Sequence, residues 1–280
     1  TIQNSVVNNT SAKAALDIAL HDLVAKSMHQ PLYKFLGGGK PELKILTTVS
    51  VKAVAEMVED AQLFVAQGFE TLKIKVGLNP AEDIQRLKAI REAVGDSISI
   101  LSDANQGWDA KSALQIIDSL AAQNLGIAMV EQPVKAWDYA NLKYVRDNSR
   151  IPIYADESAF NLRDVSKIIQ AQMADGINIK LMKSAGLYAA RPIYDLATSH
   201  NLPCMAGCML ESPIGLAAMA AFVVGKSNIK FVDLDPIAMI KSNPVVGGVR
   251  LDGATLHLST GAGLGIENIQ GLIPVVTIGA

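Results

Sequence analysis

The feature that most constrains this 280-residue chain is a strand-and-helix unit that recurs at steps of 24 to 28 residues. Short β-branched runs, which predict strands, alternate with amphipathic windows, which predict helices. The predicted strands are residues 45–49, 71–76, 97–103, 126–131, 151–156, 176–180, 202–207 and 229–235. The clearest helical windows are residues 53–68, 80–94, 109–122 and 161–174. Several of these windows begin with the Pro, Asp or Asn residues that favour helix starts.

Eight near-equal strand–helix units predict a single α/β barrel of the (β/α)8 type, the TIM barrel, in a modified (β/α)7β form. A doubly wound open sheet uses the same units and is the alternative. Because such barrels routinely run to about 250 residues as one domain, the length does not require two ordinary domains.

Composition excludes several classes of partner and site. Lys and Arg total 25 against 27 Asp and Glu, so no basic surface predicts nucleic-acid or membrane binding. The longest apolar run, residues 213–225, is too short to span a bilayer. Cys204 and Cys208 are predicted to be buried small hydrophobes in a reducing compartment, which favours a cytoplasmic protein. A metal role for them is the alternative, but neither a histidine nor a third cysteine is near.

Two lysines interrupt the predicted strand 71–76. Side chains alternate along a strand, so Lys73 and Lys75 face opposite to the apolar residues and point into the barrel, about 7 Å apart. Two close, buried ammonium groups lower each other's pKa, which makes a lysine usable as a general base. The alternative is a pair of solvated lysines at a sheet edge.

Three carboxylates stand at the ends of three successive predicted strands. Asp103, Glu131 and Asp156 each follow apolar residues, at steps of 28 and 25 residues. Strand ends of a closed barrel converge on one mouth, so these groups need a compensating cation, and oxygen ligands suit Mg²⁺ first and Mn²⁺ second. The alternative is that they are three separate helix caps.

Lys180 lies on the next strand and shares its inward face with Asn178. It would lie across the mouth from Lys75, with the metal between them, forming a site with two opposed bases. Lys183 falls beyond the strand end and is expected to be solvated. On the last predicted strand, Asp233 and Asp235 share an inward face and suit a cationic group such as an ammonium. A helix cap with a buried salt bridge is the alternative for this pair.

The motifs KIK, DANQGW, VEQP, ADES and NIK, in this order and spacing, resemble the enolase superfamily in its muconate-lactonising subgroup. The resemblance covers residues 11–265. Within that subgroup, the aspartate pair 53 residues after Lys180 is similar to that of dipeptide epimerases of the L-Ala-D/L-Glu type.

The resemblance implies an isomerase that moves a proton at the α-carbon of the C-terminal residue of a dipeptide, through a metal-stabilised enolate. Mg²⁺ would bind Asp103, Glu131 and Asp156, and hold the substrate carboxylate. Lys75 and Lys180 would be the acid–base pair, assisted by Lys73. The remaining assigned residues are Asp233 and Asp235, which would bind the dipeptide's α-ammonium, and Asn105 and Asn178, which would support the site from beside it.

Other members of the superfamily provide alternatives with the same site, namely N-acyl amino acid racemase, o-succinylbenzoate synthase and muconate cycloisomerase. A non-catalytic barrel ranks below these. The resemblance also implies a homo-oligomer and three segments. Residues 1–39 would link the barrel to an N-terminal α+β cap that is absent from the sequence, residues 40–260 would form the barrel, and residues 261–280 would be a tail that packs on the cap.

Overall fold

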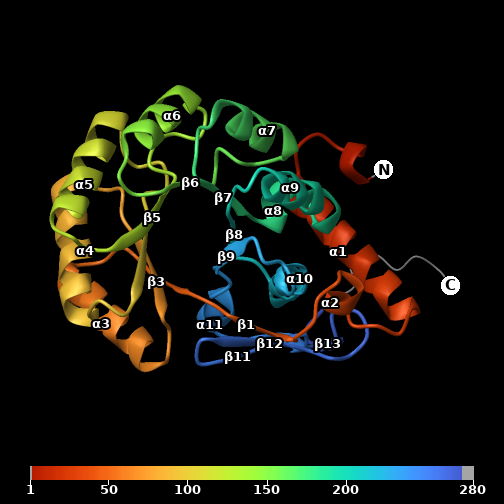
Figure 1. Ribbon diagram of the computed structural model, residues 1–280. Coiled ribbons are helices and arrows are strands. Elements are labelled where there is room, and N and C mark those ends of the chain that lie inside the picture. Colours follow the sequence, from red (N-terminus) through yellow and green to blue (C-terminus); the bar gives the residue numbers. More distant parts are fainter. Residues whose placement is uncertain (1, 273–280) are drawn as a thin grey trace.

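The computed structural model describes residues 2–272, and its centre is an eight-stranded parallel sheet in which every strand pairs with its neighbours in sequence. This order confirms the α/β barrel-type fold predicted from the repeated units, with the sheet curled around an interior (Figure 1). The strands are β2 (Thr47–Val49), β3 (Thr71–Lys75), β4 (Ser99–Asp103), β5 (Ile127–Glu131), β6 (Ile153–Ala155), β7 (Gly176–Ile179), β8 (Cys204–Ala206) and β9 (Ile229–Val232).

Helices follow the strands and cover the outside of the curled sheet (Figure 1). The longer ones are α3 (Val54–Ala66), α4 (Pro80–Val94), α5 (Ala110–Ala122), α6 (Tyr139–Asn148), α7 (Leu162–Ala171), α9 (Leu187–Ser199) and α10 (Pro213–Val223). Single turns, α8 (Leu181–Ser184) and α11 (Pro236–Met239), follow β7 and β9. Since only this short turn follows the last strand, the architecture is the modified (β/α)7β form. Among the described helices, none has the length and hydropathy needed to cross a membrane.

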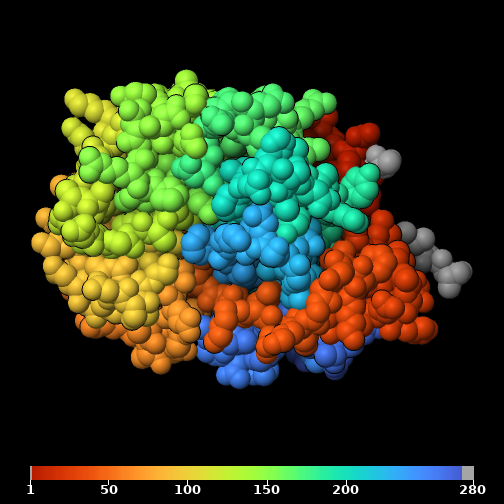
Figure 2. Space-filling view, viewed as in Figure 1, coloured from red at the N-terminus to blue at the C-terminus, as the bar shows by residue number. Residues whose placement is uncertain are grey.

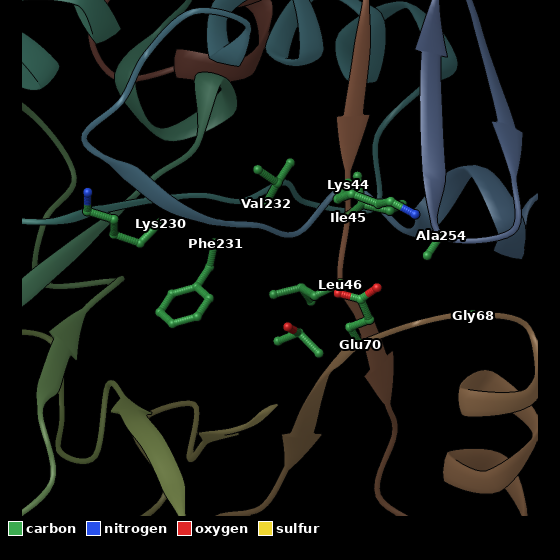
Figure 3. Close-up of a pocket in the computed structure, with 10 residues that line it drawn as sticks. Lys44, Ile45, Leu46, Gly68, Glu70, Lys230, Phe231, Val232 and Ala254 are labelled. Atoms are coloured by element: carbon green, nitrogen blue, oxygen red, sulfur yellow. The ribbon is translucent and has the colours of Figure 1, made fainter. Parts of the chain in front are cut away.

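The interior of the barrel below the strands' carboxyl ends is filled by side chains. The buried layer there comprises Leu46, Leu101, Met129, Tyr154 and Met205. The first and last strands of the sheet approach each other without forming a described strand pair, and the hydrogen bond from Leu46 N to Val232 O, 2.9 Å long, joins the two segments. A cavity of about 140 Å³ remains at this seam, between Leu46, Val232 and the side chain of Glu70 (Figure 3).

Both ends of the described chain pack together beside the barrel. The N-terminal segment contains η1 (Ile2–Asn4), α1 (Thr10–Ser27) and α2 (Leu32–Phe35), and α1 packs against α8 and α9. Two antiparallel sheets, which the repeat did not predict, join β1 (Glu42–Lys44) to β12 (Thr255–Leu258) and β11 (Val249–Asp252), and β10 (Val245–Gly247) to β13 (Ile266–Ile269). The red–orange and blue segments are therefore neighbours at one side of the molecule (Figure 2).

Two sequence predictions are affected by these boundaries. The last barrel strand ends at Val232, so Asp233 and Asp235 lie beyond it rather than on its inward face. The predicted tail 261–280 contains β13, but residues 273–280 lie outside the described part of the chain. The division into link, barrel and tail remains a prediction.

Candidate active site

Strand register brings the predicted lysine and carboxylates together at the carboxyl end of the sheet. In the parallel ladder Lys75 is opposite Asp103, and Asp103 is opposite Glu131. Asp156 and Lys180 are the first residues beyond β6 and β7. Because β4, β5 and β6 lie between β3 and β7 in the sheet, Lys75 and Lys180 flank the three carboxylates from opposite sides.

Lys73 is the cation around which this mouth is arranged. Its Nζ lies 3.0 Å from Asp103 Oδ2, 2.9 Å from Glu131 Oε2 and 2.9 Å from Asp233 Oδ2, and the side chain is buried. Burial lowers the pKa of Lys73, but the charges of these carboxylates outweigh it and hold its pKa well above the ordinary value. The predicted lowering of the pKa by a neighbouring lysine is therefore wrong for Lys73, which is paired with acids.

Lys75 is the more accessible lysine of the pair, with a side chain that is 27% exposed. Its Nζ donates to Asp103 Oδ2 and to Asn105 Oδ1, both at 2.7 Å. Asn105 donates its backbone N–H to Asp103 Oδ1 at 2.9 Å and its side-chain Nδ2 to Glu157 Oε1 at 3.4 Å. Asn105 thus connects the proposed base, one carboxylate of the mouth and Glu157, which the sequence analysis did not identify.

On the opposite side, two lysines bind one carboxylate. Lys180 Nζ donates to Asp156 Oδ2 at 2.6 Å, and Lys183 Nζ donates to Asp156 Oδ1 at 2.5 Å. Burial lowers the pKa of Lys180, yet Asp156 and Glu131 raise it above its ordinary value. Lys183 is buried, so the expectation that it is solvated is wrong. The single turn of α8 directly after Lys180 returns Lys183 beneath the strand ends.

The three carboxylates differ in how their charge is compensated. For Asp103 and Asp156, burial opposes ionisation, but the adjacent lysines outweigh it and lower the pKa of each. Burial and the charge of Asp103 raise the pKa of Glu131 to about 7. Glu131 Oε1 accepts from Asn178 Nδ2 at 2.8 Å, so Asn178 lies beside this carboxylate. Glu131 is therefore the acid whose negative charge is least supported.

Asp233 and Asp235 are both buried at the mouth, but their carboxylates meet different groups. Asp233 contacts Lys73, whereas Asp235 Oδ2 accepts from the backbone N–H of Thr48 at 2.6 Å. Burial and the charge of Asp233 raise the pKa of Asp235 to about 6. Both aspartates lie at the mouth, and Asp235 also binds the backbone of β2 at its middle residue.

Glu211 is an acid that the sequence analysis did not identify. It lies in the loop between β8 and α10, and neither carboxylate oxygen has a well-aligned hydrogen bond within residues 2–272. Burial raises the pKa of Glu211 to about 7. Its position in a loop gave no periodic signal that could have revealed it. Gln132, fully buried next to Glu131, was missed for the same reason.

The carboxylate oxygens of the mouth suit a hard divalent cation, although in this structure they surround the ammonium of Lys73. No three His, Cys, Asp or Glu residues of the described range are spaced to hold a metal ion. Lys73 Nζ occupies the point that Asp103 and Glu131 share, and acts there as a stand-in cation. Glu131 Oε2 is 2.9 Å from that ammonium but lacks a well-aligned hydrogen bond. This buried oxygen, with carboxylates as its neighbours, fits the oxygen-only ligand set of Mg²⁺.

Comparison with protein families identifies two matching domains. Residues 56–270 match the enolase C-terminal domain-like family. Residues 1–37 match the N-terminal domain of the mandelate racemase/muconate lactonizing enzyme family. The second match covers most of the segment that the sequence analysis assigned to a helical link.

Individual relatives share both sequence and structure with the chain. The L-Ala-D/L-Glu epimerase of Clostridium acetobutylicum is 43% identical over 96% of this chain and 75% of the relative. The substrate-liganded L-Ala-D/L-Glu epimerase of Bacillus subtilis has a TM-score of 0.93 and 42% identity, covering 96% of this chain and 75% of that one. The dipeptide epimerase of Enterococcus faecalis V583, in complex with Mg and L-Leu-L-Tyr, has a TM-score of 0.90 and 41% identity, covering 93% and 73%.

Proposed function

Because the chain belongs to the mandelate racemase/muconate lactonizing enzyme family of the enolase superfamily, we propose that it is a Mg²⁺-dependent epimerase of dipeptides of the L-Ala-D/L-Glu type. The observation that carries the proposal is the placement of Lys75 and Lys180 on opposite sides of three buried carboxylates. Two bases on opposite faces of one carbon are what inversion requires, because one removes the proton and the other returns it.

Each side chain of the mouth has a role in this reaction. Asp103, Glu131 and Asp156 would hold Mg²⁺, which supplies Lewis-acid stabilisation of negative charge on the substrate carboxylate. Lys73 keeps its proton, since its pKa is well above the ordinary value, and adds a fixed positive charge to the same region. Lys75 and Lys180 exchange a proton with the α-carbon of the C-terminal residue from its two sides.

The other end of the dipeptide would be bound by the aspartate pair. Asp233 and Asp235 are buried carboxylates at the same mouth, and a substrate ammonium would form charge-assisted hydrogen bonds with them. An N-acylated or purely anionic substrate lacks that ammonium. This pair is why dipeptide epimerisation is favoured over N-acyl amino acid racemisation, dehydration or lactone formation at the same site.

Deuterium exchange tests the proposal directly. With Mg²⁺ and L-Ala-L-Glu in D₂O, the chain should label the glutamyl α-carbon and form L-Ala-D-Glu, as followed by NMR. Lys75→Ala and Lys180→Ala should each reduce epimerisation about 10²- to 10⁴-fold, because each removes one acid–base group. Lys75→Ala should still exchange the α-proton of one dipeptide epimer, and Lys180→Ala that of the other, because each variant keeps the base on one face of the α-carbon.

Two controls complete this experiment. Lys88→Ala removes an exposed lysine of α4 and should leave both rates unchanged. N-acetyl-L-Ala-L-Glu lacks the ammonium and should be exchanged about 10- to 100-fold more slowly, the loss expected for a charge-assisted hydrogen bond. An absence of label from both dipeptide epimers would refute the proposed epimerase, and faster exchange of the acetylated substrate would favour an N-acyl amino acid racemase.

A further inference from the structure

Gln132 connects the ends of β5 and β6 through its backbone N–H, which donates to Tyr154 O at 2.9 Å, and through its side chain. Its Oε1 accepts from the backbone N–H groups of Asp156, at 2.9 Å, and Ser158, at 3.0 Å. Its Nε2 donates to Val134 O at 2.9 Å and Ser158 Oγ at 2.8 Å. The amide is fully buried and uses both acceptor and both donor positions, so its orientation is fixed.

The backbone conformation of Gln132 is unusual for a residue with a side chain. Its φ is +37°, in the left-handed region, where glycine is favoured and other residues are strained. Gln132 directly follows Glu131, so the left-handed turn lies where the strand carrying one carboxylate ends. Such strained positions persist when the surrounding contacts determine them. Here the four side-chain hydrogen bonds act together with two backbone ones, from Gln132 N to Tyr154 O and from Gln106 N to Gln132 O.

Lys183 holds the same aspartate from the other side. Its Nζ donates to Asp156 O and Asp156 Oδ1, both at 2.5 Å, and to Asn178 O at 2.8 Å. The ammonium is buried and its three protons have three acceptors. Asp156 is therefore fixed at its N–H by Gln132, and at its carbonyl and Oδ1 by Lys183. Oδ2 is the oxygen that neither residue holds, and it accepts from Lys180.

We propose that Gln132 and Lys183 are positioning residues that together set the orientation of Asp156 for binding a divalent cation. The inference rests on the proposed function, in which Asp156 is one of the three cation ligands. A ligand that is already oriented loses less conformational freedom on binding, and outer partners of this kind raise metal affinity about 10- to 100-fold. Neither residue touches the reacting carbon, so each acts through Asp156.

Calorimetric titration with Mg²⁺ alone tests this role without relying on turnover. Gln132→Met and Lys183→Met keep side chains of similar length but remove the hydrogen bonds. We expect each to weaken Mg²⁺ binding about 10- to 100-fold. At saturating Mg²⁺, dipeptide turnover should recover much of the wild-type kcat, because the acid–base lysines are intact.

Matched controls separate this effect from a general loss of polar contacts. Gln106→Met removes a glutamine whose Oε1 accepts from Ala136 N at 2.9 Å and that does not hold Asp156. Lys226→Met removes a lysine whose ammonium lies over the rings of Phe222 and Tyr194. Both controls should bind Mg²⁺ within about twofold of the wild type.

A milder variant keeps the test decisive if the methionine variants fail to fold. Ser158→Ala removes one partner of Gln132 Nε2 and should weaken Mg²⁺ binding several-fold. Folded variants with wild-type Mg²⁺ affinity would overturn the positioning role, as would a wild-type chain that binds no Mg²⁺. If the wild type binds Mg²⁺ but exchanges no dipeptide proton, the proposed epimerase fails, whereas weaker Mg²⁺ binding by the variants would still support the positioning role.

Discussion

Individual charges at the mouth are tolerated inside the barrel because almost every one has a partner. A buried carboxylate without compensation is costly, and its pKa rises until it becomes neutral. Lys73 compensates three acids at once, and Lys180 and Lys183 compensate Asp156. Glu211 is an exception, because both of its oxygens are buried without an ion pair or a well-aligned hydrogen bond among the described residues.

This exception predicts a pH dependence of stability. The pKa of Glu211 is about 7 in the folded chain, against an ordinary value of 4.5. Between these values the folded chain holds a proton that the unfolded chain has released, so the free energy of unfolding falls as pH rises through this window. Glu211→Gln cannot ionise and should be more stable than the wild type by about 3 kcal/mol above pH 7.

Urea denaturation of both proteins at several pH values measures this difference. It should vanish below about pH 4.5, where Glu211 is protonated in both states. Glu131 and Asp235, whose pKa values are also raised, are present in both proteins and cancel from the comparison. Parallel stability curves for wild type and variant would show that Glu211 is ionised in the fold.

Residues inside strands could be assigned from sequence, whereas residues just beyond them could not. Alternation gave the inward direction of Lys73 and Lys75 because a strand fixes which way each side chain points. Lys183, Gln132 and Glu211 lie in a single helical turn or in loops, where no period relates position to direction. Their burial depends on how the backbone turns after each strand, which the sequence pattern does not specify.

At the scale of the elements, β6 and β7 fit together because an aromatic residue of β6 lies opposite a glycine of β7. Gly176, the first residue of β7, pairs with Tyr154 of β6, and a Cβ on Gly176 would overlap the Tyr154 ring. That ring is buried in the layer that fills the barrel interior, and it packs edge-to-face on Phe231, with ring centroids 6.2 Å apart. The glycine therefore provides the space that the tyrosine occupies.

Gly176→Ala should accordingly destabilise the fold by about 1–3 kcal/mol, the usual cost of overpacking a buried site. Combining it with Tyr154→Leu should recover part of that loss, because leucine has no ring, whereas combining it with Tyr154→Phe should not. Urea denaturation of the single and double variants measures the coupling between the two positions.

Gly39→Ala is the matched control for this series, since a Cβ there meets nothing within 4 Å. It should change stability little. If Gly176→Ala were equally neutral, or if phenylalanine relieved the loss as well as leucine, contact with the Tyr154 ring would not be the reason for glycine at this position.

Strand and helix order could be predicted because each unit is local, but the small sheets could not. Strand β1 pairs with β12, more than two hundred residues away in the sequence, and each strand has only three or four residues. Such short strands carry little periodic signal, and their pairing depends on where the barrel has already brought the chain ends. The end of β9 at Val232, before both aspartates, was missed because alternation continues past it in the sequence.

At the scale of the whole molecule, the charged groups of the mouth and the apolar side chains of the interior occupy different levels of the barrel. The carboxyl ends of the strands carry most of the lysines and carboxylates, and the interior below them is filled by the layer around Leu46 and Tyr154. Among the described residues, one backbone hydrogen bond, from Leu46 to Val232, joins the segments of β2 and β9 beside a small cavity (Figure 3). The mouth is thus built from groups on several strands, and a ligand that binds them stabilises the fold as a unit.

Mg²⁺ should therefore stabilise the entire folded chain against unfolding. A ligand that binds only the folded state at a hundred times its Kd adds about 2.7 kcal/mol. Glu131 must lose its proton to bind the ion, and its pKa is about 7, so Mg²⁺ affinity should fall as pH is lowered through that value and binding should release a proton. The unfolding temperature at pH 6 and pH 8, with Mg²⁺ or with EDTA, measures both effects. Asp103→Asn should lose most of the Mg²⁺-induced shift at both pH values, whereas an equal shift in that variant would mean that Mg²⁺ acts elsewhere on the protein.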